Sequence, residues 1–191
     1  MLDRLVVASK NPDKVAEMEA VLLGLGLARR IVRDAEWPDV EETGATLEEN
    51  ALLKARVVAG ATGLPALADD TGLEVDALGG GPGVHTGRYA GREATYSDNV
   101  DRLLRELEGV EDRSARFRSV IALVRPSGEE VVVEGVLAGR VAYSARGKSG
   151  FGYDPVFEVE GRTLGEMGAD EKNLRSHRAQ ALRALAERLG T

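Results

Sequence analysis

The sequence of 191 residues contains no cysteine. This absence excludes disulfides, thiol nucleophiles and cysteine-ligated metal sites. No apolar run approaches the roughly 20 residues that a membrane helix needs, and the N-terminus Met1–Ala8 lacks the layout of a secretory signal. We therefore expect a cytoplasmic protein with no membrane partner.

Basic side chains are in the minority, with 25 Lys and Arg against 32 Asp and Glu and a formal net charge of −7. Nucleic-acid-binding surfaces normally carry a basic stripe, so no nucleic-acid partner is expected. A nucleotide substrate remains compatible, because a local basic pocket or a metal ion can offset an acidic surface. The content of 43% hydrophobic and 30% charged residues is typical of a globular protein.

The first 70 residues predict alternating strands and helices. Asn11 is a typical helix N-cap, Pro12 suits the first helical position, and Thr46 opens a capping box with Glu49. The expected elements are strands at 5–8 and 65–68, helices from 12 to 25 and from 46 to Gly60 or Gly63, and an irregular stretch at 31–45.

The pattern changes after residue 114, where apolar and polar residues alternate on both sides of a Pro-Ser-Gly turn. This alternation predicts a β-hairpin. The expected elements are a helix capped by Ser97, hairpin strands at 117–124 and 130–141, and a final helix from about 170 to 189. Helices and strands that alternate first, with a hairpin inserted later, predict an α/β fold with a mixed sheet and helices packed on it.

One candidate anion site lies where the first helix begins. A helix N-terminus presents unpaired N–H groups and the positive end of the helix dipole. The glycines of a Walker A loop are missing, and the alternative is an ordinary capped helix with an exposed lysine. The candidate residues are Ser9, Lys10, Asn11, Pro12, Asp13 and Lys14.

Asp69 and Asp70 follow the second predicted strand, where α/β proteins often bind ligands. Adjacent carboxylates there are costly unless a cation neutralises them, and only one should face a cleft because successive strand residues point in opposite directions. Magnesium takes one or two protein carboxylates, so Asp70 with Glu41 or Glu42 would suffice. The alternatives are a polar turn and a solvated acidic loop.

The segment Gly150–Pro155 combines glycines that allow close approach to a ligand with aromatic rings that could stack on a base. The alternative is an aromatic plug over the core. On the last helix, Lys172, His177 and Arg178 form a dense set of donors. His177 also shares a helical stripe with Leu174, so a buried structural histidine is a second possibility.

Taken in order, these segments resemble the family of non-canonical purine nucleoside triphosphate pyrophosphatases, the inosine/xanthosine triphosphate diphosphatases or Ham1-like family. The resemblance covers essentially the whole chain. The matching motifs are Ser9–Lys14, Glu41–Gly44, Glu49–Ala51, Leu67–Leu73, Leu78–Gly83, Arg88–Gly91, Gly150–Pro155 and Ser176–Arg178.

The resemblance implies an α/β fold with a twisted mixed sheet and flanking helices, forming two lobes around a central cleft within one domain over residues 1–191. It also implies a homodimer and Mg²⁺-dependent hydrolysis of ITP, dITP or XTP to the monophosphate and pyrophosphate, which would cleanse the nucleotide pool of deaminated purines.

The resemblance also implies roles for single residues. Asp70 would accept a proton and bind magnesium, with Glu41 as the second carboxylate, although Glu42 stays open. The implied phosphate contacts are Ser9 to Lys14, Thr71 and Lys172. The implied base contacts are Phe151, Gly152, Tyr153, Asp154, His177 and Arg178.

Small departures from the family pattern occur at Thr71, where serine is commoner, and at His85–Gly87, which replaces a more usual Tyr-Ser-Ala. Two other functions stay open from the sequence. One is hydrolysis of ordinary or pyrimidine nucleotides, as in the Maf-like group; the other is nucleotide binding without turnover.

Overall fold

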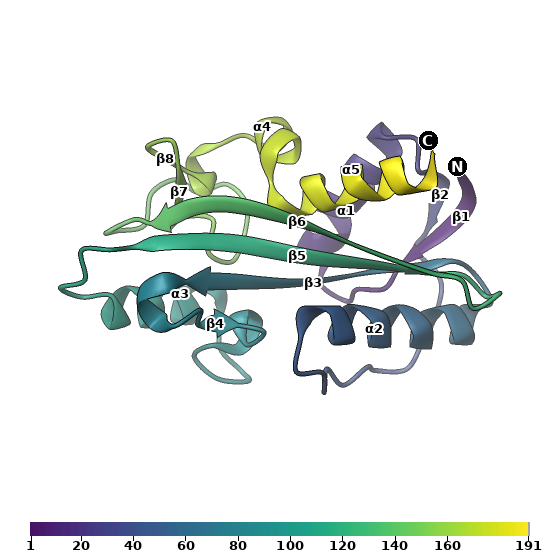
Figure 1. Cartoon of the computed structure of the whole chain (residues 1–191), viewed down its shortest axis with the longest axis horizontal. Helices are drawn as coiled ribbons and strands as arrows, with labels where there is room; N and C mark the ends of the chain where they lie inside the picture. The colour runs from purple at the N-terminus through teal and green to yellow at the C-terminus, as the bar shows by residue number, and fades with distance from the viewer. Residues whose placement is uncertain (191) are drawn as a thin grey trace. The chain divides into compact units, whose positions relative to one another are not determined.

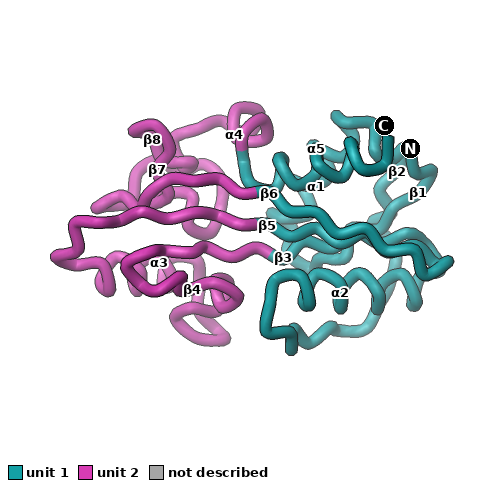
Figure 2. The backbone as a smooth tube through the Cα atoms, viewed as in Figure 1, with its two compact units in different colours: residues 1–70, 119–135, 176–191 teal, residues 71–118, 136–175 magenta. Residues whose placement is uncertain are grey.

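The computed structural model describes residues 1–190, which divide into two compact units (Figure 2). Unit 1 consists of residues 1–70, 119–135 and 176 onward, and unit 2 consists of residues 71–118 and 136–175. Among the described helices, none is long and apolar enough to cross a membrane.

Helices and strands alternate in the first part of the chain, as the sequence predicts (Figure 1). The strands are β1 (Leu2–Val7), β2 (Ala28–Val32), β3 (Ala66–Val75), β4 (Pro82–Gly83), β5 (Ser114–Val124), β6 (Glu130–Val141), β7 (Phe157–Val159) and β8 (Arg162–Thr163). The α-helices are α1 (Pro12–Gly24), α2 (Leu47–Thr62), α3 (Tyr96–Glu106), α4 (Ala169–Arg175) and α5 (His177–Leu189), and the short 3₁₀ turns are η1 (Asp76–Leu78), η2 (Thr86–Arg88) and η3 (Leu164–Glu166).

Unit 1 is a sheet with helices on both faces. Its strands or strand parts follow the order β2-β1-β3-β5-β6, and β1 is parallel to both of its neighbours. Figure 1 shows α1 and α5 on one face of these strands and α2 on the other. Apolar side chains from β1, α1, β5 and α5 form one buried core cluster. The predicted α/β fold with a mixed sheet and flanking helices is therefore confirmed.

The starts of α1 and α2 follow the predicted caps. The Asn11 side chain accepts hydrogen bonds from the N–H groups of Asp13 and Lys14, at 3.0 and 3.3 Å, and Pro12 is the first residue of α1. At α2, Thr46 and Glu49 form the expected reciprocal capping box. These local contacts fix where each helix begins.

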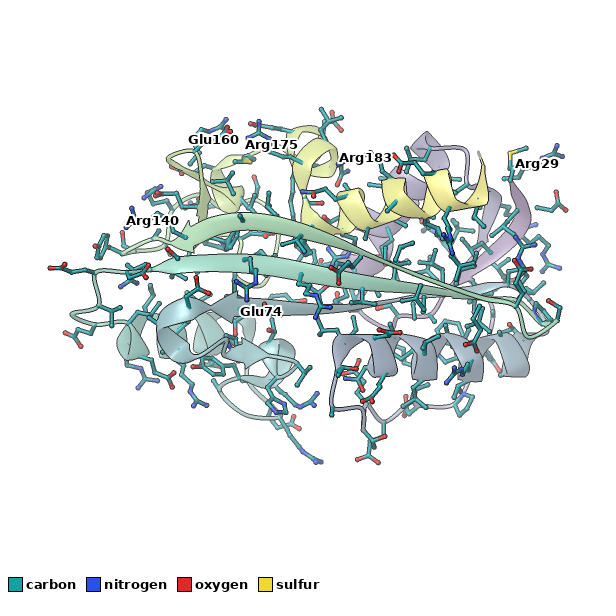
Figure 3. The ribbon with its side chains drawn as sticks, in the orientation of Figure 1. Arg29, Glu74, Arg140, Glu160, Arg175 and Arg183 are labelled. Carbon is teal, nitrogen blue, oxygen red and sulfur yellow. The ribbon has the colours of Figure 1, made fainter. Side chains whose placement is uncertain are left out.

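Unit 2 has its own strands and its own core. Its strands or strand parts follow the order β3-β5-β6-β7-β8, with β4 antiparallel to β3 and β7 antiparallel to β6 and β8. Phe117 and Phe157 pack with ring centroids 4.6 Å apart. On the surface, Arg175 at the end of α4 donates to Glu160 at 3.1 Å (Figure 3). The hairpin of β5 and β6, predicted from the alternation, is confirmed.

Two strand predictions need correction. β3 does not end before Asp69 but continues to Val75, because Ser119 of β5 donates to the Asp69 side chain and β4 pairs with Leu73. β2 lies partly in the stretch predicted to be irregular; its consecutive exposed arginines, Arg29 and Arg30, interrupt the apolar pattern.

Two helix predictions also differ from the structure. The N-cap of α3 is Thr95 rather than Ser97, because Asp98 completes a capping box with Thr95. The predicted final helix is two helices, since the Ser176 hydroxyl accepts the N–H of Ala179 and starts α5 anew. This break separates Leu174, which is exposed, from the buried His177.

Candidate active site

Asp69 and Asp70 lie in β3 and reach opposite faces of the sheet in unit 1. The side chain of Asp69 contacts residues of α1 and α5, whereas that of Asp70 contacts residues of α2. Successive side chains of a strand point to opposite faces, so this split follows from the extended backbone. The expectation that the two side chains point in opposite directions is confirmed, and their different roles stay a prediction.

Asp69 is enclosed by donors. Its carboxylate lies 3.0 Å from the ammonium of Lys14 and 3.1 Å from the guanidinium of Arg178, and it accepts a close hydrogen bond from Ser119. Burial alone would raise the pKa of Asp69, but the charges of Arg178 and Lys14 and the Ser119 bond hold it well below the usual value. Asp69 is therefore an ionised anchor for the cations around it.

Arg178 joins three elements at this anchor. One guanidinium nitrogen donates to Asp69 and the other terminal nitrogen donates to Glu17 of α1 at 2.6 Å. Ser176 donates to the same glutamate at 3.3 Å. Since Arg178 and its neighbour His177 are both buried at the start of α5, the Ser-His-Arg motif ties α5 to α1 and β3. The predicted base contacts of His177 and Arg178 stay predictions.

Asp70 lies in a second cluster, which contains a lysine that sequence reasoning missed. The ammonium of Lys54 donates to Asp70 at 2.9 Å, to Glu42 at 2.6 Å and to the carbonyl of Asp69 at 2.9 Å. The amide of Asn50 donates to Asp70 at 3.3 Å. Asn50 and Lys54 are four residues apart on α2, so both side chains lie on one face of that helix.

The pKa values of Asp70 and Lys54 depend on two effects, their burial and the charges of their neighbours. Burial raises the pKa of Asp70, Lys54 opposes the rise, and the charge of Glu42 adds to it, so the net direction is upward. Burial would lower the pKa of Lys54, but the charges of Asp70 and Glu42 outweigh it and raise the pKa. Asp70 is consequently a stronger base than an exposed aspartate.

Two carboxylates, from Asp70 and Glu42, converge on one cation in this cluster, the Lys54 ammonium. Glu41, the predicted second ligand, is exposed, whereas Glu42 is half-buried and reaches Lys54. Glu42 is therefore the glutamate that shares the Lys54 ammonium with Asp70, while the choice between Glu41 and Glu42 as a metal ligand stays a prediction. Among residues 1–190, no group of three His, Asp or Glu side chains could hold a metal ion, but magnesium needs only one or two carboxylates.

The predicted phosphate residues form a structured turn at the start of α1. The N–H of Asn11 donates to the Ser9 hydroxyl at 3.2 Å, and Lys10 forms a close ion pair with Asp39. A groove of about 260 Å³ runs alongside, lined by residues that include Ser9, Lys10 and Trp37. The turn thus combines a hydroxyl, an ammonium and a helix N-terminus, which suits an anion.

Unit 2 brings together Phe151, Asp154 and Lys172. Asp154 accepts hydrogen bonds from the N–H of Phe151 at 2.8 Å and from the ammonium of Lys172 at 2.6 Å. The same ammonium lies 4.7 Å from the centroid of the Phe151 ring. Gly150 has a φ of +73°, and a Cβ there would lie 2.0 Å from the Asp154 carboxylate, so only glycine fits.

Tyr153, the other aromatic residue of this segment, belongs to the core of unit 2. Its hydroxyl donates to the carbonyl of Thr86 at 3.0 Å, and burial raises its pKa. Phe151 is half-buried and is therefore the ring with an accessible surface. Thr86 stands in the divergent His85–Gly87 segment, where its hydroxyl accepts the N–H of Leu73 at 2.8 Å and secures the loop to β3.

Thr71 and Gly152 are the remaining predicted residues. Thr71 is half-buried in β3 and is the first residue of unit 2. Gly152 has a φ of +61°, with open space where a Cβ would stand. For the missed Lys54 the sequence offered one signal, its spacing of four from Asn50 on a helix that follows an acidic loop, and Asn50 itself lay in the matching motif Glu49–Ala51 without an assigned role. It offered none for Glu17 or Ser119, whose roles depend on contacts distant in sequence.

The fold agrees with comparisons to known proteins. The sequence model of the Ham1 family matches residues 5–188, and the chain belongs to this family. A dITP/XTP pyrophosphatase of Symbiobacterium thermophilum is 51% identical over 189 residues, covering 97% of this chain and 94% of that protein. One of Geobacter sulfurreducens is 49% identical over 194 residues, covering 99% and 98%.

Solved structures give the same family. The structure of a HAM1 protein from Coxiella burnetii matches with a TM-score of 0.87 and 45% identity, covering 100% of this chain and 99% of that chain. The Ham1 protein of Staphylococcus aureus matches with a TM-score of 0.84 and 36% identity, covering 98% of each chain.

Proposed function

We propose that this chain is a magnesium-dependent nucleoside triphosphate pyrophosphatase that hydrolyses ITP, dITP and XTP to the monophosphate and pyrophosphate. Such a reaction would remove deaminated purines from the nucleotide pool. The family membership and the relatives named dITP/XTP pyrophosphatase support the class of enzyme.

The observation that carries the proposal is the cluster of Asp70, Glu42 and Lys54. A buried carboxylate with a raised pKa is a good proton acceptor, because its conjugate acid gives up the proton less readily than that of a surface carboxylate. A second carboxylate beside it and a cation already held by both show that this position suits positive charge.

Asp70 and Glu42 would hold the magnesium ion. When bound, the ion would neutralise charge on the triphosphate and make the attacking water more acidic. Asp70 would accept the proton from that water, and Lys54 would hold the Asp70 carboxylate in place. The Ser9–Lys14 turn would bind phosphate oxygens through the Ser9 hydroxyl, its lysine ammonium groups and the positive end of the α1 dipole.

Base selection would depend on the 6-position of the purine. Donors aimed at a 6-oxo group form a hydrogen bond with hypoxanthine or xanthine but meet another donor in adenine, and a mismatched buried polar pair discriminates strongly. The candidates for base contacts are Phe151 to Asp154, His177 and Arg178, with Lys172 and Thr71 as further substrate contacts. Among these, Phe151 offers the accessible ring for stacking.

A panel of nucleotides tests the proposal. With magnesium present, the purified chain should release pyrophosphate from XTP, ITP and dITP far faster than from ATP, GTP or pyrimidine triphosphates. Equal rates across the panel would contradict the specificity, and orthophosphate as the first product would contradict cleavage between the α and β phosphates. Binding without any turnover would favour a nucleotide-binding module.

Two further expectations stay predictions. The homodimer can be checked by light scattering of the purified chain. The cytoplasmic location can be checked by fractionation of the cells that produce it.

A further inference from the structure

Tyr96 is an aromatic residue that the proposed mechanism does not use. It is the first residue of α3, and 42% of its surface is exposed. The start of this helix is secured without it, because Thr95 and Asp98 form the capping box. The buried side chains of α3 are Asn99, Val100 and Leu103, so the core of unit 2 does not account for a tyrosine at this position either.

The ring of Tyr96 packs against Phe151. Their centroids are 5.9 Å apart and the rings are tilted by 39°, which lies within the range of favourable aromatic pairs. The Phe151 ring thus contacts both the Tyr96 ring and the Lys172 ammonium. Its backbone N–H is held in addition by Asp154. These contacts restrict both the main chain and the ring of Phe151.

Tyr96 and Phe151 do not stack on the two faces of one base. Two rings that sandwich a base must lie about 7 Å apart and parallel, because each stacking contact needs about 3.5 Å. The observed separation is smaller and the rings are tilted. The geometry fits a supporting ring, which limits the orientations available to Phe151.

We propose that Tyr96 is a positioning residue for base recognition, which holds the Phe151 ring in the orientation that stacks on the purine. The inference rests on the proposed function, since it assumes that a purine triphosphate is the substrate. A Phe151 ring that is already ordered loses less conformational entropy when the base binds, so the contribution of Tyr96 belongs to binding rather than to the hydrolytic step.

Steady-state kinetics with XTP test this role. Tyr96→Ala should raise KM about three- to tenfold, which is the size expected for one aromatic pair, and leave kcat within about twofold. Tyr96→Phe keeps the ring and should restore the wild-type KM. Tyr143→Ala is the matched control, because Tyr143 is also an exposed tyrosine of unit 2 but its ring contacts Arg113 and Arg140.

A double-mutant cycle makes the test specific to Phe151. In a Phe151→Ala background, Tyr96→Ala should have little further effect on KM, because the ring that it positions is gone. The inference is overturned if Tyr96→Ala leaves KM unchanged, if its effect is the same with and without Phe151, or if kcat falls instead of KM rising. These outcomes leave the proposed function intact, whereas a wild-type chain without pyrophosphate release would overturn both.

Discussion

Two adjacent aspartates of β3 have opposite surroundings in unit 1. Asp69 is enclosed by Lys14, Arg178 and Ser119, and its pKa is held far down. Asp70 has one ammonium and one amide, shares that ammonium with Glu42, and its pKa is raised. The surroundings of Asp69 stabilise its charged form, whereas those of Asp70 make its carboxylate a better proton acceptor. Substitution of each aspartate should therefore affect a different property.

Asp70→Asn should abolish turnover while preserving nucleotide binding. The amide keeps the shape of the carboxylate but cannot accept a proton, so kcat for XTP should fall by about 10²- to 10⁴-fold. Nucleotide binding, measured by calorimetry, should remain detectable because the Ser9–Lys14 turn is unchanged. A variant with the wild-type rate would remove Asp70 from the mechanism.

Asp69→Asn should reduce stability. It leaves Lys14 and Arg178 without their shared carboxylate, and breaking a buried ion pair costs about 3–5 kcal/mol. Because the pKa of Asp69 is lower in the folded chain, its stabilisation is complete above the ordinary value of 3.8 and is lost as the pH falls through the folded value.

Thermal denaturation of the wild type and of Asp69→Asn across the pH range measures this effect. The difference in the free energy of unfolding between the wild type and Asp69→Asn should be largest near neutral pH and should decrease below about pH 4. A difference that increases as the pH falls would contradict the assignment of Asp69 as an ionised carboxylate that holds Lys14 and Arg178.

The two neighbouring glutamates allow a matched comparison. Glu42→Gln should raise the magnesium concentration needed for half-maximal activity by about 10- to 100-fold, as the loss of a group that holds or orients a metal usually does. Glu41→Gln should stay close to the wild type, because Glu41 is exposed and Glu42 is the residue that reaches Lys54. A larger increase in this magnesium concentration for Glu41→Gln than for Glu42→Gln would favour Glu41 as the second carboxylate.

At the scale of elements, unit 1 depends on a close approach between β6 and α5. A Cβ added at Gly135 would lie 2.2 Å from the carbonyl oxygen of His177 and 2.3 Å from the backbone nitrogen of Ala181. Both neighbours are backbone atoms of α5, which cannot rotate away. This approach positions the start of the helix that carries Arg178 to Asp69.

Gly135→Ala should therefore destabilise the fold by about 1–3 kcal/mol or more, because the helix must shift to admit the methyl group. Gly60→Ala is the control; Gly60 is exposed in α2, and a Cβ there meets nothing within 4 Å. It should stabilise the chain by about 0.5–1 kcal/mol through helix propensity. Denaturant titrations should show a lower unfolding midpoint for Gly135→Ala and a higher one for Gly60→Ala than for the wild type. Equal midpoints would contradict the close approach of β6 and α5.

At the scale of the whole molecule, metal dependence is the broadest prediction. Removal of divalent cations with EDTA should abolish pyrophosphate release, and added Mg²⁺ should restore it, since the single charge of Lys54 does not offset a triphosphate together with Asp70 and Glu42. The measurement is a magnesium titration of the rate with XTP. Full activity in EDTA would rule out the metal requirement.

Local signals in the sequence predicted much of the fold because they act between near neighbours. Asn11 and Thr46 cap helices through side-chain bonds to N–H groups two or three residues away. The alternation after residue 114 predicted the hairpin for the same reason. The length of β3 was missed because it depends on contacts with other elements, Ser119 with Asp69 and β4 with Leu73. The break at Ser176 was missed although its cap is local, since the Ser176 hydroxyl accepts the N–H of Ala179.

The sequence by itself determined the family, the order of the motifs and the opposite facing of Asp69 and Asp70, since strand alternation is a property of the chain. Only the tertiary structure decided which charges meet. It brought Lys54 to Asp70 and Glu42, and it brought Arg178 of α5 to Asp69 across 109 positions of sequence. The physical reason is that pKa values and ion pairs depend on distance and burial in space, which spacing along the chain does not specify.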